Sequence, residues 1–275
     1  MAADGQAALS IGRVLKLSWS VLAARWLSFT GLMLIAMLLA AVAIGMLFFG
    51  CVLVVEAIPS SGGGGLYFND TQTAVMGVTL FAQAVAFLAI QQIGTAAVAF
   101  GTVQYLRGQQ VAFGRCLSHG FAVMLPVAGT TCAATLIVGI PLVGVVLLGS
   151  FVSEAFFLVS VVIAPLLACP FAVVAPVAAL ERASVRQALA RSVSLVRDNY
   201  FRTLALLLLF AAASFAGTVL LGMVSDIVWD FTFLISIAAL LAVAVFAAIA
   251  VAVTYVELRQ IKEGFGADEV AKLFD

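Results

Sequence analysis

The side chains that most often perform chemistry in proteins are sparse in this sequence. Histidine occurs once, as His119, and no pair among the four cysteines Cys51, Cys116, Cys132 and Cys169 shows CxxC spacing. A zinc or iron site needs several nitrogen, sulfur or carboxylate ligands to converge, and a single histidine does not predict one. We interpret His119 as a polar residue at a membrane interface and the cysteines as small apolar residues. We therefore expect no disulfide, no metal and no cofactor.

Glutamines form the most polar group within the apolar part of the chain. They are Gln83, Gln91, Gln92 and Gln104. Gln83 and Gln91 are eight residues apart and share roughly one face of a helix. Two interpretations are open. The amides join neighbouring helices by hydrogen bonds, or they line a narrow polar cavity.

Arginines are concentrated in two segments. Five of them lie within 21 residues, against only Glu181 and Asp198 of opposite sign: Arg182, Arg186, Arg191, Arg197 and Arg202. Arg107 and Arg115 lie in the second segment. Near an anionic membrane surface each basic side chain contributes about 1 kcal/mol of attraction. These seven residues are candidates for binding anionic lipid headgroups, and the alternative is an arginine-rich loop that only fixes the topology.

Composition restricts the class of protein that can position these groups. The chain has 275 residues, of which 65% are hydrophobic and 9% charged, with a mean hydropathy of +1.24. A soluble domain is about 45–50% apolar and about 25% charged, so these values exclude a soluble globule as well as a disordered chain. The net charge of zero argues against a nucleic-acid partner. A polytopic membrane protein remains.

Six long stretches without charge predict six transmembrane helices. A helix crosses the hydrocarbon core with about 20 apolar residues, and membrane strands would alternate apolar and polar residues instead. The predicted spans are 28–55, 74–104, 120–148, 155–180, 203–225 and 231–257. We therefore predict an all-α fold in a single membrane domain over 1–275.

The charges between the spans predict the orientation. Segments 1–27, 105–119, 181–202 and 258–275 carry all 13 basic residues. The alternate segments, 56–73, 149–154 and 226–230, carry none, but they hold Glu56, Asp70, Glu154, Asp226 and Asp230. Basic loops stay on the cytoplasmic side, so we expect a multi-pass protein of a bacterial inner membrane with both termini in the cytoplasm.

A short pattern recurs before spans one, three and five. Residues 10–15, 112–117 and 184–189 each read as a small residue, an apolar one, two variable ones and two apolar ones. The pattern predicts three repeats of an amphipathic elbow helix followed by a helical hairpin, over about 9–104, 111–180 and 183–263. The third elbow is the clearest, with Ser184 as N-cap and an apolar stripe at helical spacing. That stripe is Val185, Leu189, Val193, Val196 and Tyr200.

Prolines are concentrated in the third and fourth spans. They are Pro126, Pro141, Pro165, Pro170 and Pro176. Each removes a backbone donor and can bend a helix, and transporters use broken helices to build binding sites. A transporter for an apolar or amphipathic molecule is therefore the alternative function, and it requires a continuous cavity among spans two to four.

The two ends of the chain and the third elbow region resemble a known family. The segments are Tyr255–Arg259 with Lys262–Phe265 and a short acidic helix 268–274, together with 183–200 and the opening 9–26. They resemble an uncharacterised bacterial six-span family, the membrane domain attached to some glycerophosphoryl diester phosphodiesterases. The resemblance implies a membrane protein without assigned activity. The phosphodiesterase chemistry belongs to a separate soluble domain, and no catalytic residue carries over.

These observations together favour a protein that is not an enzyme. We expect an integral membrane protein that organises lipids, chiefly anionic ones, or partner proteins in the membrane. A membrane protein partner and a homo-oligomer both stay open.

Overall fold

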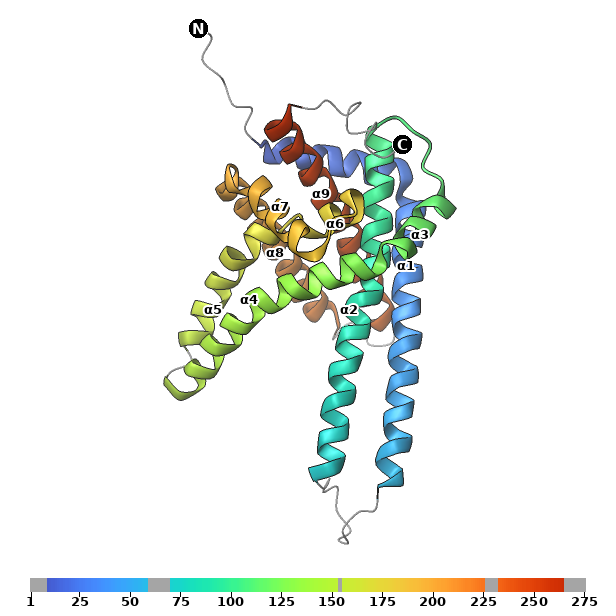
Figure 1. The fold of residues 1–275 in the computed structure, drawn as a ribbon, viewed down its shortest axis with the longest axis vertical. Helices are drawn as coiled ribbons and strands as arrows, with labels where there is room; N and C mark the ends of the chain where they lie inside the picture. The colour runs from blue at the N-terminus through green and yellow to red at the C-terminus, as the bar shows by residue number, and fades with distance from the viewer. Residues whose placement is uncertain (1–8, 59–69, 153–154, 226–231, 265–275) are drawn as a thin grey trace.

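The computed structural model describes residues 9–58, 70–152, 155–225 and 232–264 (Figure 1). These residues form helices and contain no strand. The helices are α1 (Ile11–Ala57), α2 (Asp70–Leu106), α3 (Phe113–Ala122), α4 (Met124–Val152), α5 (Ala155–Ala168), the 3-10 turn η1 (Cys169–Phe171), α6 (Val174–Glu181), α7 (Val185–Arg197), α8 (Tyr200–Ser225) and α9 (Thr232–Glu263). Glu154, Asp226 and Asp230 and the expected helix 268–274 lie outside the described residues.

The prediction of six membrane spans in an all-helical chain is confirmed for this part of the sequence. Six segments are long and apolar enough to cross a membrane. They are Ile11–Glu56, Thr71–Leu106, Met124–Val145, Val162–Glu181, Tyr200–Gly217 and Ile235–Glu263. Each overlaps one predicted span, because a long apolar run can satisfy its backbone in lipid only as a helix.

Helix α1 consists of two parts that meet at a kink. Arg25 has non-helical angles, φ −139° and ψ 32°. The part before Arg25 runs across one end of the molecule, and the part after it runs alongside α2 (Figure 1). The two helices come close at Gly94, where an added Cβ would lie 2.7 Å from Met33 Sδ and 2.9 Å from Ala36 Cβ. Glycine at this position lets α1 and α2 pack as a tight hairpin.

Helix α3 is fixed against α2 by a second close approach. Gly120 is buried, and an added Cβ would lie 2.6 Å from the Ile93 carbonyl oxygen. Helix α3 ends at Ala122, and Val123 adopts φ −103° and ψ 6° before α4 begins. The third span therefore starts at Met124 rather than at the predicted residue 120, because the chain turns between the two helices.

The fourth span is broken, which corrects the prediction of one helix over 155–180. It consists of α5, η1 and α6, with Val173 at φ −110° and ψ 16°. Pro170 has no N–H to bond the Leu166 carbonyl, and the Tyr200 hydroxyl donates to that oxygen instead, at 2.9 Å. The Ser192 hydroxyl donates to the Pro170 carbonyl at 2.8 Å. Side chains of α7 and α8 thus satisfy the backbone that the proline leaves open.

Helix α9 is the central element of the core. It contacts α1, α2, α6, α7 and α8, and its residues 252–259 are all buried. The largest fully buried side chains include Tyr255, Ile249 and Leu258 of α9, with Phe29 and Leu32 of α1. Helices α4 and α5 form a hairpin that leaves this core at an angle to the α1–α2 hairpin (Figure 1). The core therefore lies toward one end of the molecule, where the helices converge.

Candidate functional site: the basic end of the bundle

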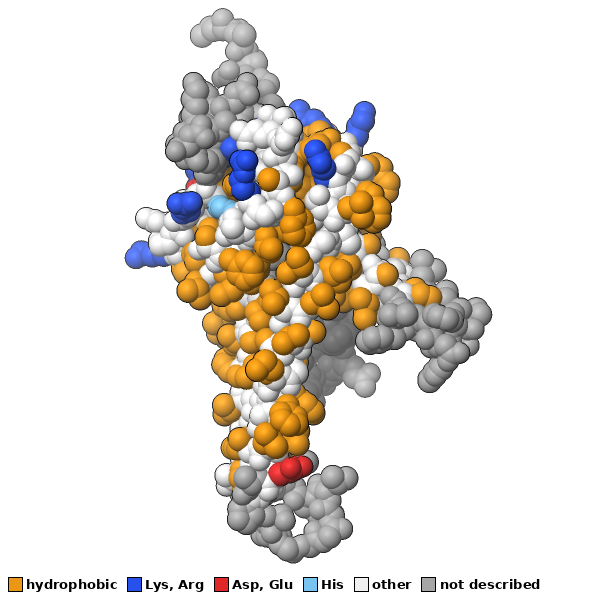
Figure 2. Space-filling model, turned by 90° about the vertical axis from the view of Figure 1, so that its right-hand side faces the viewer, with side chains coloured by type: hydrophobic (Ala, Val, Ile, Leu, Met, Phe, Trp, Pro, Cys, Tyr) orange, Lys and Arg blue, Asp and Glu red, His pale blue; other side chains and the backbone are white. Residues whose placement is uncertain are grey.

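Basic side chains gather at the end of the molecule where the helices converge. Figure 2 shows Lys and Arg near that end together with the one histidine, a hydrophobic surface along the length of the face, and an acidic side chain near the far end. We call the convergent end the basic end. It is formed by the first part of α1, the end of α2, α3, the end of α6, α7, the start of α8 and the end of α9.

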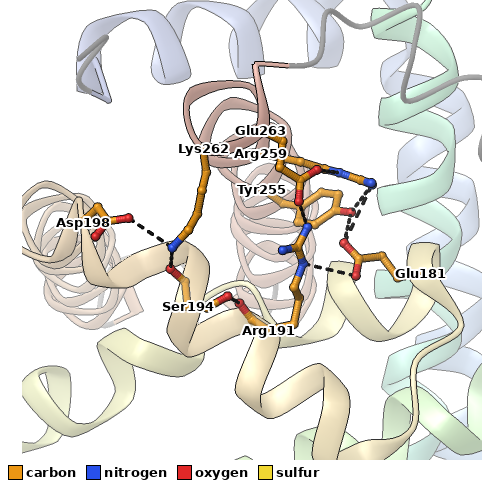
Figure 3. A network of polar contacts seen from close by, with 8 residues as sticks. All are labelled: Glu181, Arg191, Ser194, Asp198, Tyr255, Arg259, Lys262 and Glu263. Atoms are coloured by element: carbon orange, nitrogen blue, oxygen red, sulfur yellow. Dashed lines mark hydrogen bonds and ion pairs between the residues drawn. The ribbon is translucent and has the colours of Figure 1, made fainter. Parts of the chain in front are cut away.

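A polar network joins α6, α7 and α9 at this end, and Tyr255 lies at its centre (Figure 3). The Tyr255 hydroxyl donates to Glu181 Oε1 at 2.8 Å and accepts from Arg259 Nη1 at 3.0 Å. Arg259 Nε in turn donates to Glu263 Oε2 at 2.7 Å. The side chain of Arg259 is 8% exposed, and these partners supply hydrogen bonds that a buried cation requires.

Helix α7 contributes a second set of ion pairs to the network. Arg191 pairs with Glu263 and approaches Glu181 Oε2 at 3.4 Å. Lys262 Nζ lies 3.1 Å from Asp198 Oδ2 and also donates to the Ser194 carbonyl. Figure 3 shows these side chains reaching across from α7 to α9. The three cations of the network therefore match its three carboxylates, and the network is neutral as a whole.

A separate ion pair ties α1 to α9. Arg13 Nε donates to Glu257 Oε1 at 2.6 Å. The Glu257 side chain is 4% exposed and that of Arg13 is 58% exposed. Glu257 Oε2 is buried and has no hydrogen-bond partner among the described residues. The buried carboxylate therefore depends on Arg13 for its compensating charge.

The seven arginines proposed as headgroup candidates occupy different environments. Arg191 belongs to the polar network, and Arg202 Nη1 donates to the Leu9 carbonyl at 3.3 Å. Arg107 is half-buried at the end of α2. The remaining four are exposed and form no ion pair among the described residues: Arg115, Arg182, Arg186 and Arg197. We call these four the exposed arginines.

Helix α7 buries only part of its predicted apolar stripe. Ala188, Ser192, Leu195 and Val196 are buried against the bundle. Val185 and Val193, which belong to the predicted stripe, are 37% and 40% exposed. Ser184 is the N-cap as predicted, and Gln187 Oε1 accepts from its backbone N–H at 3.2 Å and from its hydroxyl at 2.9 Å. The helix thus has an exposed apolar edge beside Arg186 and Arg197.

His119 and Cys116 are both built into the packing of α3. The His119 ring stacks on Phe100 at 4.2 Å between centroids, and its Nε2 lies 3.1 Å from the Ala179 carbonyl oxygen. Because a carbonyl only accepts, Nε2 carries the hydrogen. Burial lowers the pKa of His119. The hydrogen bond to the Ala179 carbonyl raises this pKa, and the charge of Arg182 lowers it. Burial raises the pKa of the Cys116 thiol to about 11, and Arg115 opposes that shift.

The four glutamines do not share one environment. Gln92 and Gln104 are 8% and 7% exposed, and Gln104 Oε1 lies 4.0 Å from Cys116 Sγ on α3. Gln83 and Gln91 are half-buried. The contact at Gln104 joins α2 to α3. All four cysteines are free, and no group of three His, Cys, Asp or Glu that could hold a metal occurs among the residues described.

Sequence reasoning missed the polar network and the Arg13–Glu257 pair. A partial signal was present, since Arg259 and Glu263 are four residues apart and face the same side of a helix. Comparisons of the chain with family models, with curated proteins and with solved structures found no match.

Proposed function

We propose that this chain is a non-enzymatic integral membrane protein of a bacterial inner membrane, with both termini in the cytoplasm, that organises anionic lipids or partner proteins. The observation that carries the proposal is the division of cations at the basic end. Arg191, Arg259 and Lys262 are neutralised within the network, and the exposed arginines are left to face the surroundings. Basic side chains at a cytoplasmic surface attract anionic headgroups.

The short helices support a position at the membrane interface. Helices α3 and α7 precede α4 and α8, and the part of α1 before Arg25 precedes the first span. On α7 the exposed Val185 and Val193 lie beside Arg186 and Arg197, which suits a helix with apolar side chains among acyl chains and arginines at the phosphates. We propose these segments as the amphipathic elbows of three repeats, 9–104, 111–180 and 183–263.

The transporter interpretation gains no specific support from the broken span. A discontinuous helix forms a substrate site when its free backbone groups face a cavity. Here the Leu166 and Pro170 carbonyls accept from Tyr200 and Ser192. Transport through spans two to four stays a prediction, as does the resemblance to the membrane domain of phosphodiesterases.

The proposal is tested by removing exposed charge without touching the network. We expect the triple variant Arg182→Gln, Arg186→Gln, Arg197→Gln to fold and to retain its topology, because ten basic residues remain. It should lose co-purified phosphatidylglycerol and cardiolipin in native mass spectrometry and most of their thermal stabilisation. The matched control replaces the same residues with lysine and should keep both effects. If the glutamine variant keeps the same lipids and the same melting shift, the arginines act only on topology.

A further inference from the structure

An apolar groove lies beside the basic end, between the first part of α1, α8 and α9. Its volume is about 430 Å³. Leu15, Trp19 and Leu22 line it from α1, Phe210 and Ala213 from α8, and Phe246 from α9. Volumes of about 300–1,000 Å³ are usual for sites that hold small molecules. The groove contains none of the exposed arginines and none of the network residues.

Three aromatic rings that contact one another form part of the groove wall. Trp19 meets Phe246 edge-on, with ring centroids 6.5 Å apart, and Phe210 lies 5.8 Å from Phe246. Trp19 is nevertheless 65% exposed, so its indole is open to an occupant. The lining residues of α8 and α9 belong to membrane spans, and those of α1 belong to the segment before the Arg25 kink. The groove therefore runs from the end of the bundle into the apolar zone.

Lys16 lies on α1 beside the residues of that helix that line the groove, although it is not itself part of the lining. Lys16 is exposed, and it precedes Trp19 by three residues, which places the two side chains next to each other on the helix surface. Among the residues described, Lys16 forms no ion pair. An apolar groove with an indole in its wall, next to a lysine on the same helix surface, matches an alkyl chain that carries an anionic head.

We infer that the groove holds one acyl chain of an anionic phospholipid, with the phosphate at Lys16 and the chain along Trp19, Phe210 and Phe246. The inference rests on the proposed orientation of the protein, but not on headgroup binding by the exposed arginines. A second copy of the chain fits the groove less well, since stable protein interfaces bury about 1,200 Å² or more and the groove has a volume of only about 430 Å³.

Tryptophan fluorescence tests the inference directly. In a variant with Trp26→Phe and Trp229→Phe, Trp19 is the remaining tryptophan. The protein is placed in nanodiscs that contain a low fraction of phosphatidylglycerol with brominated acyl chains, or the same fraction of brominated phosphatidylcholine. We expect phosphatidylglycerol to be enriched at Trp19 about fivefold, the contribution of one basic side chain at a membrane surface. Lys16→Gln should abolish this preference.

A matched pair of variants separates occupancy of the groove from general contact with lipid. Ala213→Phe fills the groove, whereas Ala212→Phe places the same ring on the exposed surface of α8 outside it. Both alanines are exposed, so neither change disturbs the core, and circular dichroism checks the fold. Enrichment at Trp19 should fall to the bulk value in the first variant and persist in the second.

Four results would overturn the inference. They are equal quenching by the two brominated lipids, equal behaviour of the two phenylalanine variants, stronger quenching by a brominated free fatty acid, and weak quenching with cross-linking of Trp19 to a second copy. The arginine-to-glutamine triple variant should leave the Trp19 signal unchanged. Failure of the groove site and failure of the proposed function are thereby told apart.

Discussion

Arg13 Nε lies 2.6 Å from Glu257 Oε1, and this contact joins positions 244 residues apart in the chain. The pair connects the first part of α1 to the end of α9. Its two members are unequal, because Glu257 is buried and Arg13 is largely exposed. The Glu257 carboxylate is therefore largely desolvated, whereas the Arg13 side chain stays largely accessible to solvent.

We predict that this asymmetry appears in a double-mutant cycle. Arg13→Gln leaves a buried carboxylate unpaired and should lower the free energy of unfolding by about 1–3 kcal/mol. Glu257→Gln should cost less, since a neutral amide can still accept from Arg13, and the double variant should be less destabilised than the sum of the singles. Reversible unfolding in mixed micelles measures all three. Strictly additive losses would mean that the two residues are not coupled.

Two arginines of α7, Arg191 and Arg186, should differ in their roles. Arg191→Gln removes the partner of Glu181 and Glu263 and should lower the melting temperature by several degrees without changing the bound lipids. Arg186→Gln should have the opposite profile, because Arg186 is exposed. Thermal unfolding and native mass spectrometry on the same samples check both. Loss of lipid in the Arg191 variant alone would reverse the assignment.

His119 should make stability depend on pH. Its pKa is lowered below the ordinary value of 6.5, chiefly by burial, so the folded protein favours the neutral ring. Its contribution to stability is complete above pH 6.5 and is lost as the pH falls below that value toward the lowered pKa. His119→Gln should be less stable at pH 7.5, having lost the stack on Phe100. Its melting temperature should then change less than that of the wild type between pH 7.5 and 5.5.

Gly120 and Gly139 should respond differently to alanine. A Cβ at Gly120 would lie 2.6 Å from the Ile93 carbonyl oxygen, a backbone atom, and one at Gly139 meets nothing within 4 Å. Gly120→Ala should separate α3 from α2 and lower the melting temperature. Gly139→Ala should be at least as stable as the wild type, because alanine favours a helix by about 0.5–1 kcal/mol over glycine. Equal stability of the two variants would contradict the close approach of α3.

The proposed topology can be read from two exposed positions. In a background without the four native cysteines, Thr71→Cys should react with an impermeant thiol reagent added to intact cells. Gln109→Cys should react only after permeabilisation, since it lies in the basic segment after α2. The inverse pattern would place the basic end outside.

The spans were predictable because every backbone N–H and C=O group of a segment that crosses lipid must be hydrogen-bonded within the protein. A run such as 231–256 has no charge and can only be a helix in a membrane, whatever it packs against. The N-cap at Ser184 was readable for a similar reason, since its partner Gln187 is local. Features set by nearest neighbours in the chain were therefore available from the sequence.

Features that depend on distant partners were not available. Nothing near Pro170 in the sequence shows that Tyr200 and Ser192 supply the hydrogen bonds at the break. The prolines indicated that the span over 155–180 could bend, but its division into α5, η1 and α6 was not predicted. Likewise, the sequence of 182–202 does not show which of its arginines form ion pairs and which are exposed. Only the position of α9 separates Arg191, with Glu263 beside it, from the exposed Arg186.

The position of α9 also constrains the order in which the helices can assemble. Glu257, Tyr255 and Arg259 are the partners of Arg13 and Glu181, and they are translated after every helix that they hold together. Until α9 is synthesised, the hairpin of α1 and α2 lies in the bilayer without it. Arg13 then has no Glu257 as partner, and the surfaces of α1 and α2 that later contact α9 are covered only by lipid. The contacts of α9 with α1, α2, α6, α7 and α8 can therefore form only after α9 has been synthesised, and an insertion factor that shields α1 and α2 until then would protect the partly assembled protein.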